Sequence, residues 1–392
     1  MKHYKYLIIG GVLAGDAATR GIRELDAEGS IGLISMESDP PYMRPNLSKG
    51  LWKGRPVEKI WRKTEERAEL LLGRKVTALD TKQKTVKDDK GDEYTYDKLL
   101  IATGGSPIRL PFGENNIVYF RSFQHYQRLR KMADEKNRFV VIGGGFIGSE
   151  IAAALAMTGK QVTMIFLEDA IGGRVFPSEL SHHLNDYYRE KGVDVISGDT
   201  VASVQMDGDR FNIQTGSGRA IEADGVVAGI GIRPNVSLAQ EAGLNVENGI
   251  VVNENLQTSA SDVFAAGDAV NFFHTALGKR VRVEHEDNAV AMGKLAGRNM
   301  AGANETYNHV PMFYSDLFEL GYEAVGEMSS EMETVVDWQD KFKQGVIYYL
   351  ADGRVRGVLL WNVWKKLGDA RALIAEKGPF KAEDLIGRIK GE

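Results

Sequence analysis

Two glycine-rich segments, residues 10–15 (GGVLAG) and 143–148 (GGGFIG), lie about 130 residues apart and have the spacing of phosphate-binding turns. In such a turn a strand leads into a helix N-terminus, whose free N–H groups and positive dipole end hold a pyrophosphate. The first glycine permits the tight turn, the second lets phosphate approach, and the third allows close helix–strand packing. Two such turns predict an enzyme that brings two dinucleotides together, a flavin and a nicotinamide.

The first turn has glycine at Gly10 and Gly15, and we expect its helix to begin near Gly15. Val12 stands at the second glycine position, so its Cβ points where the pyrophosphate would approach. We therefore expect this turn to widen or to bind more weakly. The next strand ends near Glu37, about 20 residues further on, where a carboxylate accepts hydrogen bonds from a ribose. The alternative interpretation is an ordinary strand–turn–helix of an α/β protein.

The second turn carries all three glycines, Gly143, Gly145 and Gly148, after an apolar strand. The strand that follows the helix ends at Glu168, about 20 residues after the last glycine. A carboxylate there accepts from both ribose hydroxyls and repels a 2′-phosphate, so it favours NADH over NADPH. Arg174, shortly after Glu168, is the one feature that could soften this preference.

Composition is that of a two- or three-domain enzyme of 392 residues, with 43% apolar and 26% charged residues. Its 44 glycines are about 11% of the chain, above the usual ~7%. A net charge of −5 argues against a nucleic-acid-binding surface, which would normally be basic. The apolar runs are too short to cross a bilayer, and the N-terminus enters its first strand at once, leaving no room for a targeting peptide. We expect a cytoplasmic protein.

The chain contains no cysteine. Without a thiol it cannot run a dithiol relay beside a flavin, form a sulfenic acid or hold an iron–sulfur cluster. Disulfide reductases and cysteine-dependent peroxidases are thereby excluded as function classes. Electrons must leave directly from the flavin. The adjacent His182 and His183 lie in a charged segment and are most simply solvated, so we expect no metal site.

Two further apolar strands end in small-residue turns, at residues 99–105 (LLIATGG) and 226–231 (VVAGIG). Both resemble crossovers between domains, where glycine lets the backbone pass close to a cofactor. Plain turns are the alternative interpretation of each. The candidate cofactor contacts in these turns are Ala102, Thr103, Gly104 and Gly231.

Residues 263–268 (VFAAGD) place Asp268 after a buried strand, at an expected helix start. An aspartate there is commonly an N-cap. Beside a flavin it would instead bind the ribitol chain.

Several motifs, in order along nearly the whole chain, resemble the apoptosis-inducing-factor-like branch of the FAD-dependent pyridine nucleotide reductases. A more distant similarity is to ferredoxin and rubredoxin reductases. The motifs are residues 41–49 (PYMRPNLSK), 101–105 (IATGG), 143–150 (GGGFIGSE), 265–268 (AAGD), 283–285 (VEH), 345–350 (GVIYYL) and 360–362 (LWN).

The resemblance implies an α/β fold of the glutathione-reductase type, with two Rossmann-like dinucleotide-binding domains and a C-terminal α+β domain. A discontinuous FAD domain would comprise residues 1–115 and 233–306, and an NAD domain residues 116–232. Residues 307–392 would form the C-terminal domain. Strands should alternate with helices until about residue 306.

In the C-terminal domain the sequence predicts three strands and a helix, with Trp361 and Trp364 packed inside. The expected strands are residues 321–326, 345–350 and 355–361, and the expected helix is residues 365–376. The appended sheet would cover the flavin or present a dimer or partner surface.

Carried over by position, the resemblance also implies roles for individual residues. Glu37, Arg44 and Lys49 would contact FAD, and Asp268 its ribitol. Lys49 would pair with Glu150 beneath the reactive edge of the isoalloxazine. Phe146 would lie where nicotinamide docks on the flavin, and Glu168 would hold the NADH ribose. Glu284 and His285 would border the flavin's pyrimidine end and the nicotinamide.

A cation beside a flavin raises the flavin's tendency to accept hydride, because reduction places negative charge on the ring. Lys49 would supply that charge, and Glu150, in a first helical turn, would orient it. Without the motif match, two solvated side chains would be the favoured interpretation of this pair. His285 is expected to bind or hydrogen-bond rather than to act as acid or base, since hydride transfer abstracts no proton from NADH.

The chain departs from the pattern at three positions. Val12 replaces a glycine, Asn46 stands where the family often has a proline, and Tyr314 occupies a position where relatives usually carry tryptophan. The proline-rich insertion and targeting leader of mitochondrial relatives are absent, and the acidic balance does not support their DNA-binding role. No apoptotic function is inferred.

The sequence predicts a FAD-dependent NADH oxidoreductase, a monomer or homodimer, that passes electrons to an external acceptor. A ferredoxin, a rubredoxin, a quinone and oxygen all remain open as acceptors. Two alternatives remain. One is a redox sensor that dimerises when NADH reduces its flavin and turns over slowly; the other is a flavin-free scaffold in which Val12 blocks binding.

Overall fold

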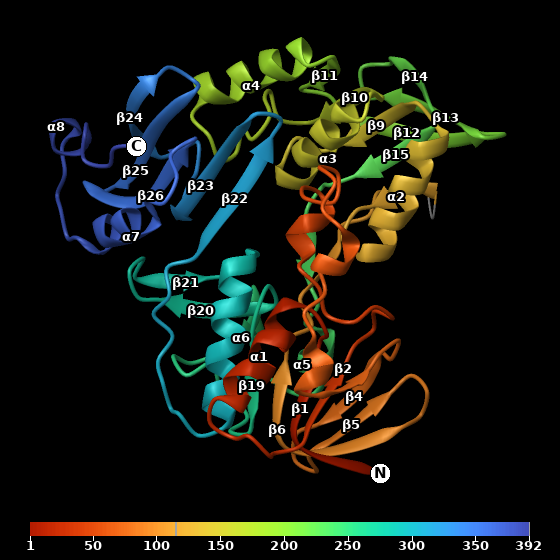
Figure 1. Cartoon of the computed structure of the whole chain (residues 1–392), viewed down its shortest axis with the longest axis vertical. Helices are drawn as coiled ribbons and strands as arrows, with labels where there is room; N and C mark the ends of the chain where they lie inside the picture. The colour runs from red at the N-terminus through yellow and green to blue at the C-terminus, as the bar shows by residue number, and fades with distance from the viewer. Residues whose placement is uncertain (114–115, 392) are drawn as a thin grey trace. The chain divides into compact units, whose positions relative to one another are not determined.

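The computed structural model describes residues 1–113 and 116–391, which divide into two compact units (Figure 1). Unit 1 comprises Met1–Asn46, Pro56–Ser106 and Arg233–Pro311; unit 2 comprises Leu47–Arg55, Pro107–Ile232 and Met312–Glu392. The expected end of the first FAD-domain segment, residue 115, lies outside the described residues. The chain thus changes unit several times, and a short piece of its N-terminal region, residues 47–55, belongs to unit 2.

Unit 1 is built on a parallel sheet in the order β3-β2-β1-β6-β19. Its strands are β1 (Lys2–Ile9), β2 (Ile31–Ile34), β3 (Glu69–Leu71), β6 (Glu93–Ile101) and β19 (Val263–Ala265). The helices α1 (Leu13–Arg23) and α6 (Glu286–Met300) lie side by side (Figure 1). Glycine permits this approach, because a Cβ on Gly293 would lie 2.2 Å from the Ala14 carbonyl oxygen.

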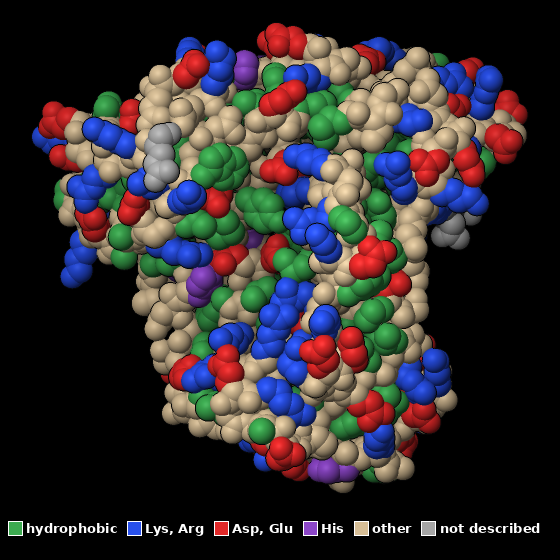
Figure 2. Space-filling view, viewed as in Figure 1, with side chains coloured by type: hydrophobic (Ala, Val, Ile, Leu, Met, Phe, Trp, Pro, Cys, Tyr) green, Lys and Arg blue, Asp and Glu red, His purple; other side chains and the backbone are tan. Residues whose placement is uncertain are grey.

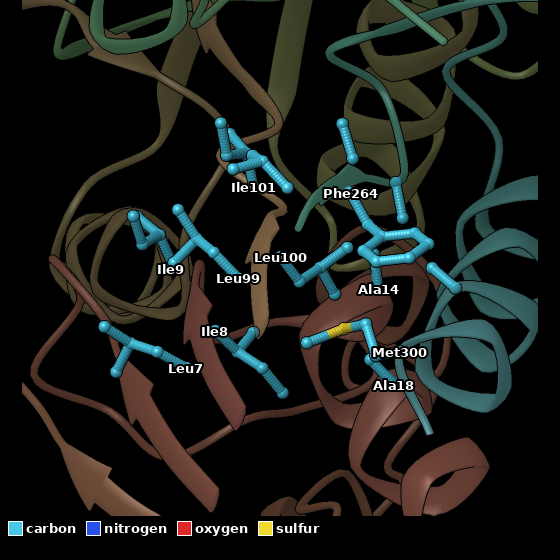
Figure 3. Packing of buried hydrophobic residues seen from close by; sticks show 14 of the residues in the cluster. Leu7, Ile8, Ile9, Ala14, Ala18, Leu99, Leu100, Ile101, Phe264 and Met300 are labelled. Carbon is cyan, nitrogen blue, oxygen red and sulfur yellow. The ribbon is translucent and has the colours of Figure 1, made fainter. Parts of the chain in front are cut away.

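The core of unit 1 lies between this sheet and its two helices. Leu7, Ile8, Leu99 and Leu100 of β1 and β6 are fully buried, and Figure 3 shows them beside side chains of α1 and α6. Only the last residues of β1 and β6 are continuously apolar and buried, as expected where parallel strands are covered on both faces, whereas their first halves alternate between exposed and buried residues. They fix the position of the turn that follows β1.

Antiparallel elements extend unit 1. The strands β4 (Val76–Asp80) and β5 (Thr85–Asp88) continue from β6, and a separate sheet contains β17 (Val246–Glu247), β18 (Gly249–Val251), β20 (Val270–His274) and β21 (Lys279–Val281). The short helices are α5 (Ser237–Glu241), η1 (Arg44–Leu47), η2 (Val57–Lys59) and η3 (Thr64–Glu66). Simple alternation of strands and helices up to residue 306 is therefore wrong.

A buried carboxylate ties the η3 region to α1. Asp16 is fully buried, and its carboxylate accepts from Arg20 (2.8 Å), Arg62 (2.9 Å), Arg67 (2.9 Å) and Thr64 (2.7 Å). Burial of a carboxylate is tolerated where each oxygen is paired, as here. No local sequence pattern predicts this cluster.

Unit 2 contains a second parallel sheet, in the order β11-β10-β9-β15-β8. Its strands are β8 (Val118–Tyr119), β9 (Arg138–Ile142), β10 (Gln161–Phe166), β11 (Val193–Ser197) and β15 (Gly225–Ala228). The helices are α2 (Phe123–Glu135), α3 (Phe146–Met157) and α4 (Ser178–Glu190), and an antiparallel ladder is formed by β12 (Val201–Asp207), β13 (Arg210–Thr215) and β14 (Ala220–Ala223). The two expected Rossmann-like sheets are thus both present. The short strands β7 (Gly105–Pro107) and β16 (Ile232–Pro234) pair where the chain changes unit.

The C-terminal sheet is antiparallel, in the order β22-β23-β26-β25-β24. It consists of β22 (Met312–Leu317), β23 (Leu320–Gly326), β24 (Glu333–Asp340), β25 (Gln344–Ala351) and β26 (Arg354–Trp361), with helices α7 (Leu367–Ala375) and α8 (Ala382–Leu385). The three expected strands and the helix are present, but both edge strands, β22 and β24, were missed. Edge strands carry weaker apolar patterns because only part of each strand is covered.

Within unit 2, α4 packs against the loops of the C-terminal sheet. The His183 ring stacks on Phe342 with centroids 4.2 Å apart, and Tyr187 donates to Glu319 at 2.5 Å. Lys191 pairs with the same carboxylate at 2.7 Å. These contacts account for one compact unit containing both the second parallel sheet and the C-terminal sheet.

Helix α1 begins at Leu13, near Gly15 as expected. Two other local expectations are wrong. Asp268 lies in a turn between β19 and β20 and does not begin a helix, because the chain re-enters a strand at once. Trp361 is buried, but Trp364 is 45% exposed because it follows the end of β26.

Surface charges are mixed on the face shown in Figure 2, where basic and acidic side chains are interspersed. None of the helices in residues 1–113 and 116–391 has the length and apolar character needed to cross a bilayer.

Candidate functional site

The first glycine turn leaves no room for side chains at two of its positions. Gly10 has φ +123°, and a Cβ there would lie 2.0 Å from the Ala102 carbonyl oxygen. A Cβ on Gly15 would lie 2.0 Å from the Gly10 carbonyl oxygen, so glycine allows α1 to close on β1. This is the close packing that a dinucleotide turn requires.

The second turn has the same construction in unit 2. Gly143 has φ +115°, and a Cβ there would lie 2.4 Å from the Gly229 carbonyl oxygen. A Cβ on Gly148 would lie 1.9 Å from the Gly143 carbonyl oxygen. Gly145, at the N-terminus of α3, is exposed, and a Cβ on it would meet no protein atom within 4 Å. The second turn therefore opens to free space where a pyrophosphate would approach.

The two turns differ at the middle position. Val12, at the N-cap of α1, has φ −125° and ψ −138°, whereas Gly145 has φ −83° and ψ −169°. Val12 is partly buried and packs against the core of unit 1. Its side chain therefore has apolar contacts of its own, and the first turn adopts a backbone different from that of the second.

Glu37 follows β2 and has both carboxylate oxygens engaged. Tyr42 donates to Oε2 and Arg44 donates to Oε1, each at 2.7 Å. The Arg44 guanidinium also lies 5.3 Å from the Tyr42 ring centroid. The structure thus brings Glu37 and Arg44 together and adds Tyr42, which the sequence did not single out.

The turn after β6 is held by a residue from a distant segment. Thr103 donates through its hydroxyl to the Asn235 carbonyl oxygen (2.7 Å), and the Asn235 side chain donates to the Thr103 carbonyl oxygen (2.9 Å). The backbone N–H of Asn235 also donates to the Gly104 carbonyl oxygen at 2.9 Å. Asn235 therefore holds the turn at the expected crossover in place. The Pro234-Asn235 pair was the one sequence signal that could have identified this residue. Gly231, φ +96°, lies at the other crossover.

Asp268 and Glu284 share a neighbour in Arg282. The Arg282 guanidinium donates to the Asp268 carbonyl oxygen at 3.2 Å and forms a short ion pair with Glu284. Gly267, with φ +86°, would place a Cβ 3.2 Å from Ala14, so the AAGD turn lies against the start of α1.

His285 is the N-cap residue of α6 and is half-buried. Burial lowers its pKa to about 4, against the opposing effect of the Asp268 and Asp287 carboxylates. A neutral imidazole at physiological pH agrees with a binding role and offers no proton to a reaction.

Glu168 and Arg174 form an ion pair in unit 2, with Arg174 Nη2 2.5 Å from Glu168 Oε1. The Arg174 side chain is 78% exposed and that of Glu168 is 25% exposed. The carboxylate that would bind a ribose is therefore beside the cation that would bind a 2′-phosphate.

Lys49 and Glu150 form a buried ion pair, with Lys49 Nζ 2.8 Å from Glu150 Oε1. Their side chains are 10% and 2% exposed, which excludes the interpretation as solvated charges. Ser48 and Ser315 each donate to the same carboxylate at 2.5 Å. Glu150 lies on α3 just after the second glycine turn. The two serines were missed, because a small polar residue gives no sequence signal.

One aromatic ring lies beside the lysine of this pair, since Lys49 Nζ is 5.0 Å from the centroid of Tyr314. Phe146, at the start of the helix that carries Glu150, has its ring centroid 4.9 Å from that of Phe313. Unit 2 thus brings Lys49 beside Glu150, in the N-terminal part of α3 that also carries Phe146, and beside Tyr314 of β22. His285 belongs to unit 1.

The donor set fits two dinucleotides. Each parallel sheet ends in a turn that only glycine can form, beside a helix N-terminus, and each is followed by a carboxylate, Glu37 or Glu168, with an arginine partner. Within residues 1–113 and 116–391, no group of acidic or histidine side chains is arranged to hold a metal ion.

Comparison with known proteins gives two family matches. The model for pyridine nucleotide-disulphide oxidoreductases matches residues 4–293. The model for the C-terminal part of mitochondrion-associated apoptosis-inducing factor matches residues 296–340 and 335–376.

Individual relatives span most of the chain. A ferredoxin reductase subunit of 5,5'-dehydrodivanillate O-demethylase from Sphingobium sp. is 35% identical over 390 residues, 96% of this chain and 94% of that protein. A Drosophila melanogaster protein named as a putative mitochondrial apoptosis-inducing factor 1 is 32% identical over an alignment of 484 residues. The alignment covers 99% of this chain and 65% of the length of that protein.

Among solved structures, putidaredoxin reductase in its covalent complex with putidaredoxin is similar along almost the whole chain. The TM-score is 0.91, with 31% sequence identity, over 98% of this chain and 96% of that one.

Proposed function

The chain belongs to the pyridine nucleotide-disulphide oxidoreductase family, and we propose that it is a FAD-dependent NADH oxidoreductase that passes electrons to a small ferredoxin-type protein. Its cofactors are FAD and a pyridine nucleotide. The observation that carries the proposal is the buried Lys49–Glu150 pair beside the second glycine turn. Taking both charges out of water costs free energy that pairing repays only in part, so a buried pair at this position favours a functional role over a purely stabilising one.

When bound, FAD would supply the redox chemistry, taking up hydride from NADH and passing electrons to the acceptor. We propose that Lys49 favours this transfer by placing a fixed cation at the flavin's reactive edge. Glu150 orients the lysine. Phe146 would lie against the docked nicotinamide, and its contact with Phe313 limits its freedom to turn. His285, neutral at pH 7, would contribute a hydrogen bond at the flavin's pyrimidine end.

Binding of FAD is assigned to unit 1, through Gly10, Gly15, Glu37, Arg44 and Asp268. Binding of NADH is assigned to Gly143, Gly145, Gly148 and Glu168 of unit 2. NADH is preferred because the Glu168 carboxylate repels a 2′-phosphate. Arg174 weakens that preference without reversing it, because its exposed side chain is already paired with Glu168.

A protein acceptor is favoured by the relatives. The Sphingobium protein is named as a ferredoxin reductase subunit, and the similar solved structure holds putidaredoxin reductase with putidaredoxin. The chain has no cysteine, so no dithiol stands between flavin and acceptor. We therefore assign the acceptor to the ferredoxin class rather than to a disulfide substrate.

Anaerobic stopped-flow mixing of the FAD-loaded protein with NADH, and separately with NADPH, tests the proposal. We expect the flavin absorbance near 450 nm to bleach rapidly with NADH and more slowly with NADPH. A [2Fe–2S] ferredoxin should then be reduced in steady state. Flavin that ignores both nucleotides contradicts the assignment as an NADH oxidoreductase. Rapid reduction followed by slow turnover with every acceptor and a change in oligomeric state would indicate the redox sensor instead.

A further inference from the structure

Glu150 receives three donors although it is almost wholly buried. Oε1 accepts from Lys49 (2.8 Å) and from Ser315 (2.5 Å), and Oε2 accepts from Ser48 (2.5 Å). Charged hydrogen bonds of this kind are stronger than neutral ones and stabilise the ionised carboxylate. Removal of any one donor leaves part of a buried charge unsatisfied.

The two serines come from separate parts of unit 2. Ser48 precedes Lys49 in the segment 47–55, and its hydroxyl fixes the oxygen that Lys49 does not touch. Ser315 lies on β22 of the C-terminal sheet and is 1% exposed. Together they determine the orientation of the carboxylate plane, and hence where Oε1 holds the lysine ammonium.

The other titratable side chains that face Glu150 are two buried tyrosines. Tyr188 of α4 donates to the Ser149 carbonyl oxygen (3.0 Å), and Tyr322 of β23 lies opposite Ser315 in the sheet. Burial, and then the negative charge of Glu150, raises the pKa of both tyrosines well above the usual value. Both therefore stay neutral. The nearby Lys53–Asp316 pair (3.1 Å) is more exposed, with side chains 42% and 34% accessible.

We propose that Ser48 and Ser315 are positioning residues for the redox reaction: they hold the ionised Glu150 in one orientation and, through it, fix the Lys49 ammonium. The proposal rests on the role of Lys49 beside the flavin given above. It assigns a function to the C-terminal sheet, which supplies one of the two hydroxyls that complete the ion pair.

The variants Ser48→Ala and Ser315→Ala should lower the FAD midpoint potential, because a less fixed cation stabilises the reduced flavin less. The rate of flavin reduction by NADH should fall about tenfold in each, as for the loss of a hydrogen bond to a charged group. The KM for NADH should stay unchanged, since neither serine belongs to the nucleotide-binding turn. Ser48→Thr and Ser315→Thr keep the hydroxyl and should recover most of the wild-type potential.

Ser149→Ala is the matched control. Ser149 is buried, precedes Glu150 on the same helix, and donates to the carbonyl oxygens of Gly145 (2.9 Å) and Phe146 (3.0 Å) rather than to the carboxylate. Its removal should leave the potential unchanged.

The midpoint potential is measured on the FAD-loaded protein by anaerobic titration with dithionite against a reference dye, without NADH. This readout tests the serines even if NADH is not the donor, so failure of the proposed function and failure of this inference are distinguishable. Wild-type potentials in both alanine variants would overturn the inference, as would an equal shift in Ser149→Ala. If an alanine variant does not fold, Ser48→Cys or Ser315→Cys takes its place, because a thiol has a similar volume but is a weaker donor than a hydroxyl. The midpoint potential should fall in these variants too, and a wild-type potential would overturn the inference.

Discussion

The Arg174 guanidinium lies 2.5 Å from the Glu168 carboxylate, so the two groups that would distinguish NADH from NADPH are each other's partners. The carboxylate repels a 2′-phosphate, and it also holds the cation that would attract one. We therefore expect the choice between NADH and NADPH in this chain to depend on the pair and not on Glu168 alone.

Glu168→Ala should narrow the NADH-over-NADPH preference by about tenfold, because it removes the repulsion and releases Arg174 toward a 2′-phosphate. The measurement is the ratio of kcat/KM values for the two nucleotides. Glu168→Ala/Arg174→Ala serves as the control and should regain part of the preference. An unchanged ratio in the single variant would mean that the ribose is recognised by other residues.

Val12→Gly should tighten FAD binding, because it removes the Cβ nearest the expected pyrophosphate. It should also destabilise the apoprotein by about 1 kcal/mol, since Val12 packs against the core and glycine adds backbone freedom. Fluorescence titration of the apoprotein with FAD gives the Kd, and thermal unfolding gives the stability. An unchanged Kd with reduced stability would show that the turn already accommodates the valine.

His285→Asn should change how the stability of the apoprotein depends on pH. The folded pKa of about 4 lies below the ordinary value of about 6.5, so between these values the unfolded chain binds more protons. Stability from the neutral imidazole is therefore fully present above about pH 6.5 and is lost as the pH falls toward 4. The Tm of His285→Asn should fall less over this window than that of wild type. The control is His182→Asn, on the exposed side of α4, and a parallel change in both variants would contradict the assignment.

Asp16→Asn should lower the free energy of unfolding by about 3 kcal/mol, because three arginine side chains lose a buried carboxylate. Urea unfolding of the apoprotein is the measurement. Glu24→Gln is the comparison, since Glu24 pairs with Lys294 and Arg298 while 39% exposed and should cost less than about 1 kcal/mol. Equal effects would mean that Asp16 contributes little beyond a surface pair.

The backbone of both nucleotide turns could be predicted from the sequence, because only glycine allows the contacts at Gly10, Gly15, Gly143 and Gly148. The buried strands were equally evident from their apolar runs. The roles assigned to Glu37, Glu168 and His285 stay predictions, since they concern bound cofactors.

The remainder depends on contacts between distant segments, which no local pattern records. Asp268 was placed at a helix start because an aspartate after a strand often caps a helix, but here the chain turns into β20. Ser48, Ser315 and Asn235 are ordinary polar residues until the fold brings their partners to them. The edge strands β22 and β24 were missed because their exposed faces dilute the alternation.

The three donors to Glu150 are made at different times during translation. Ser48 is separated from Glu150 by 102 positions along the chain, and Ser315 by 165 positions on the other side. During translation Ser48 and Lys49 are therefore made early, Glu150 about 100 residues later, and Ser315 a further 165 residues after that. A chain that ends before β22 lacks the Ser315 hydroxyl, so we expect its Lys49–Glu150 pair to be held less firmly. The full set of donors to Glu150 is therefore present only in chains that extend through β22.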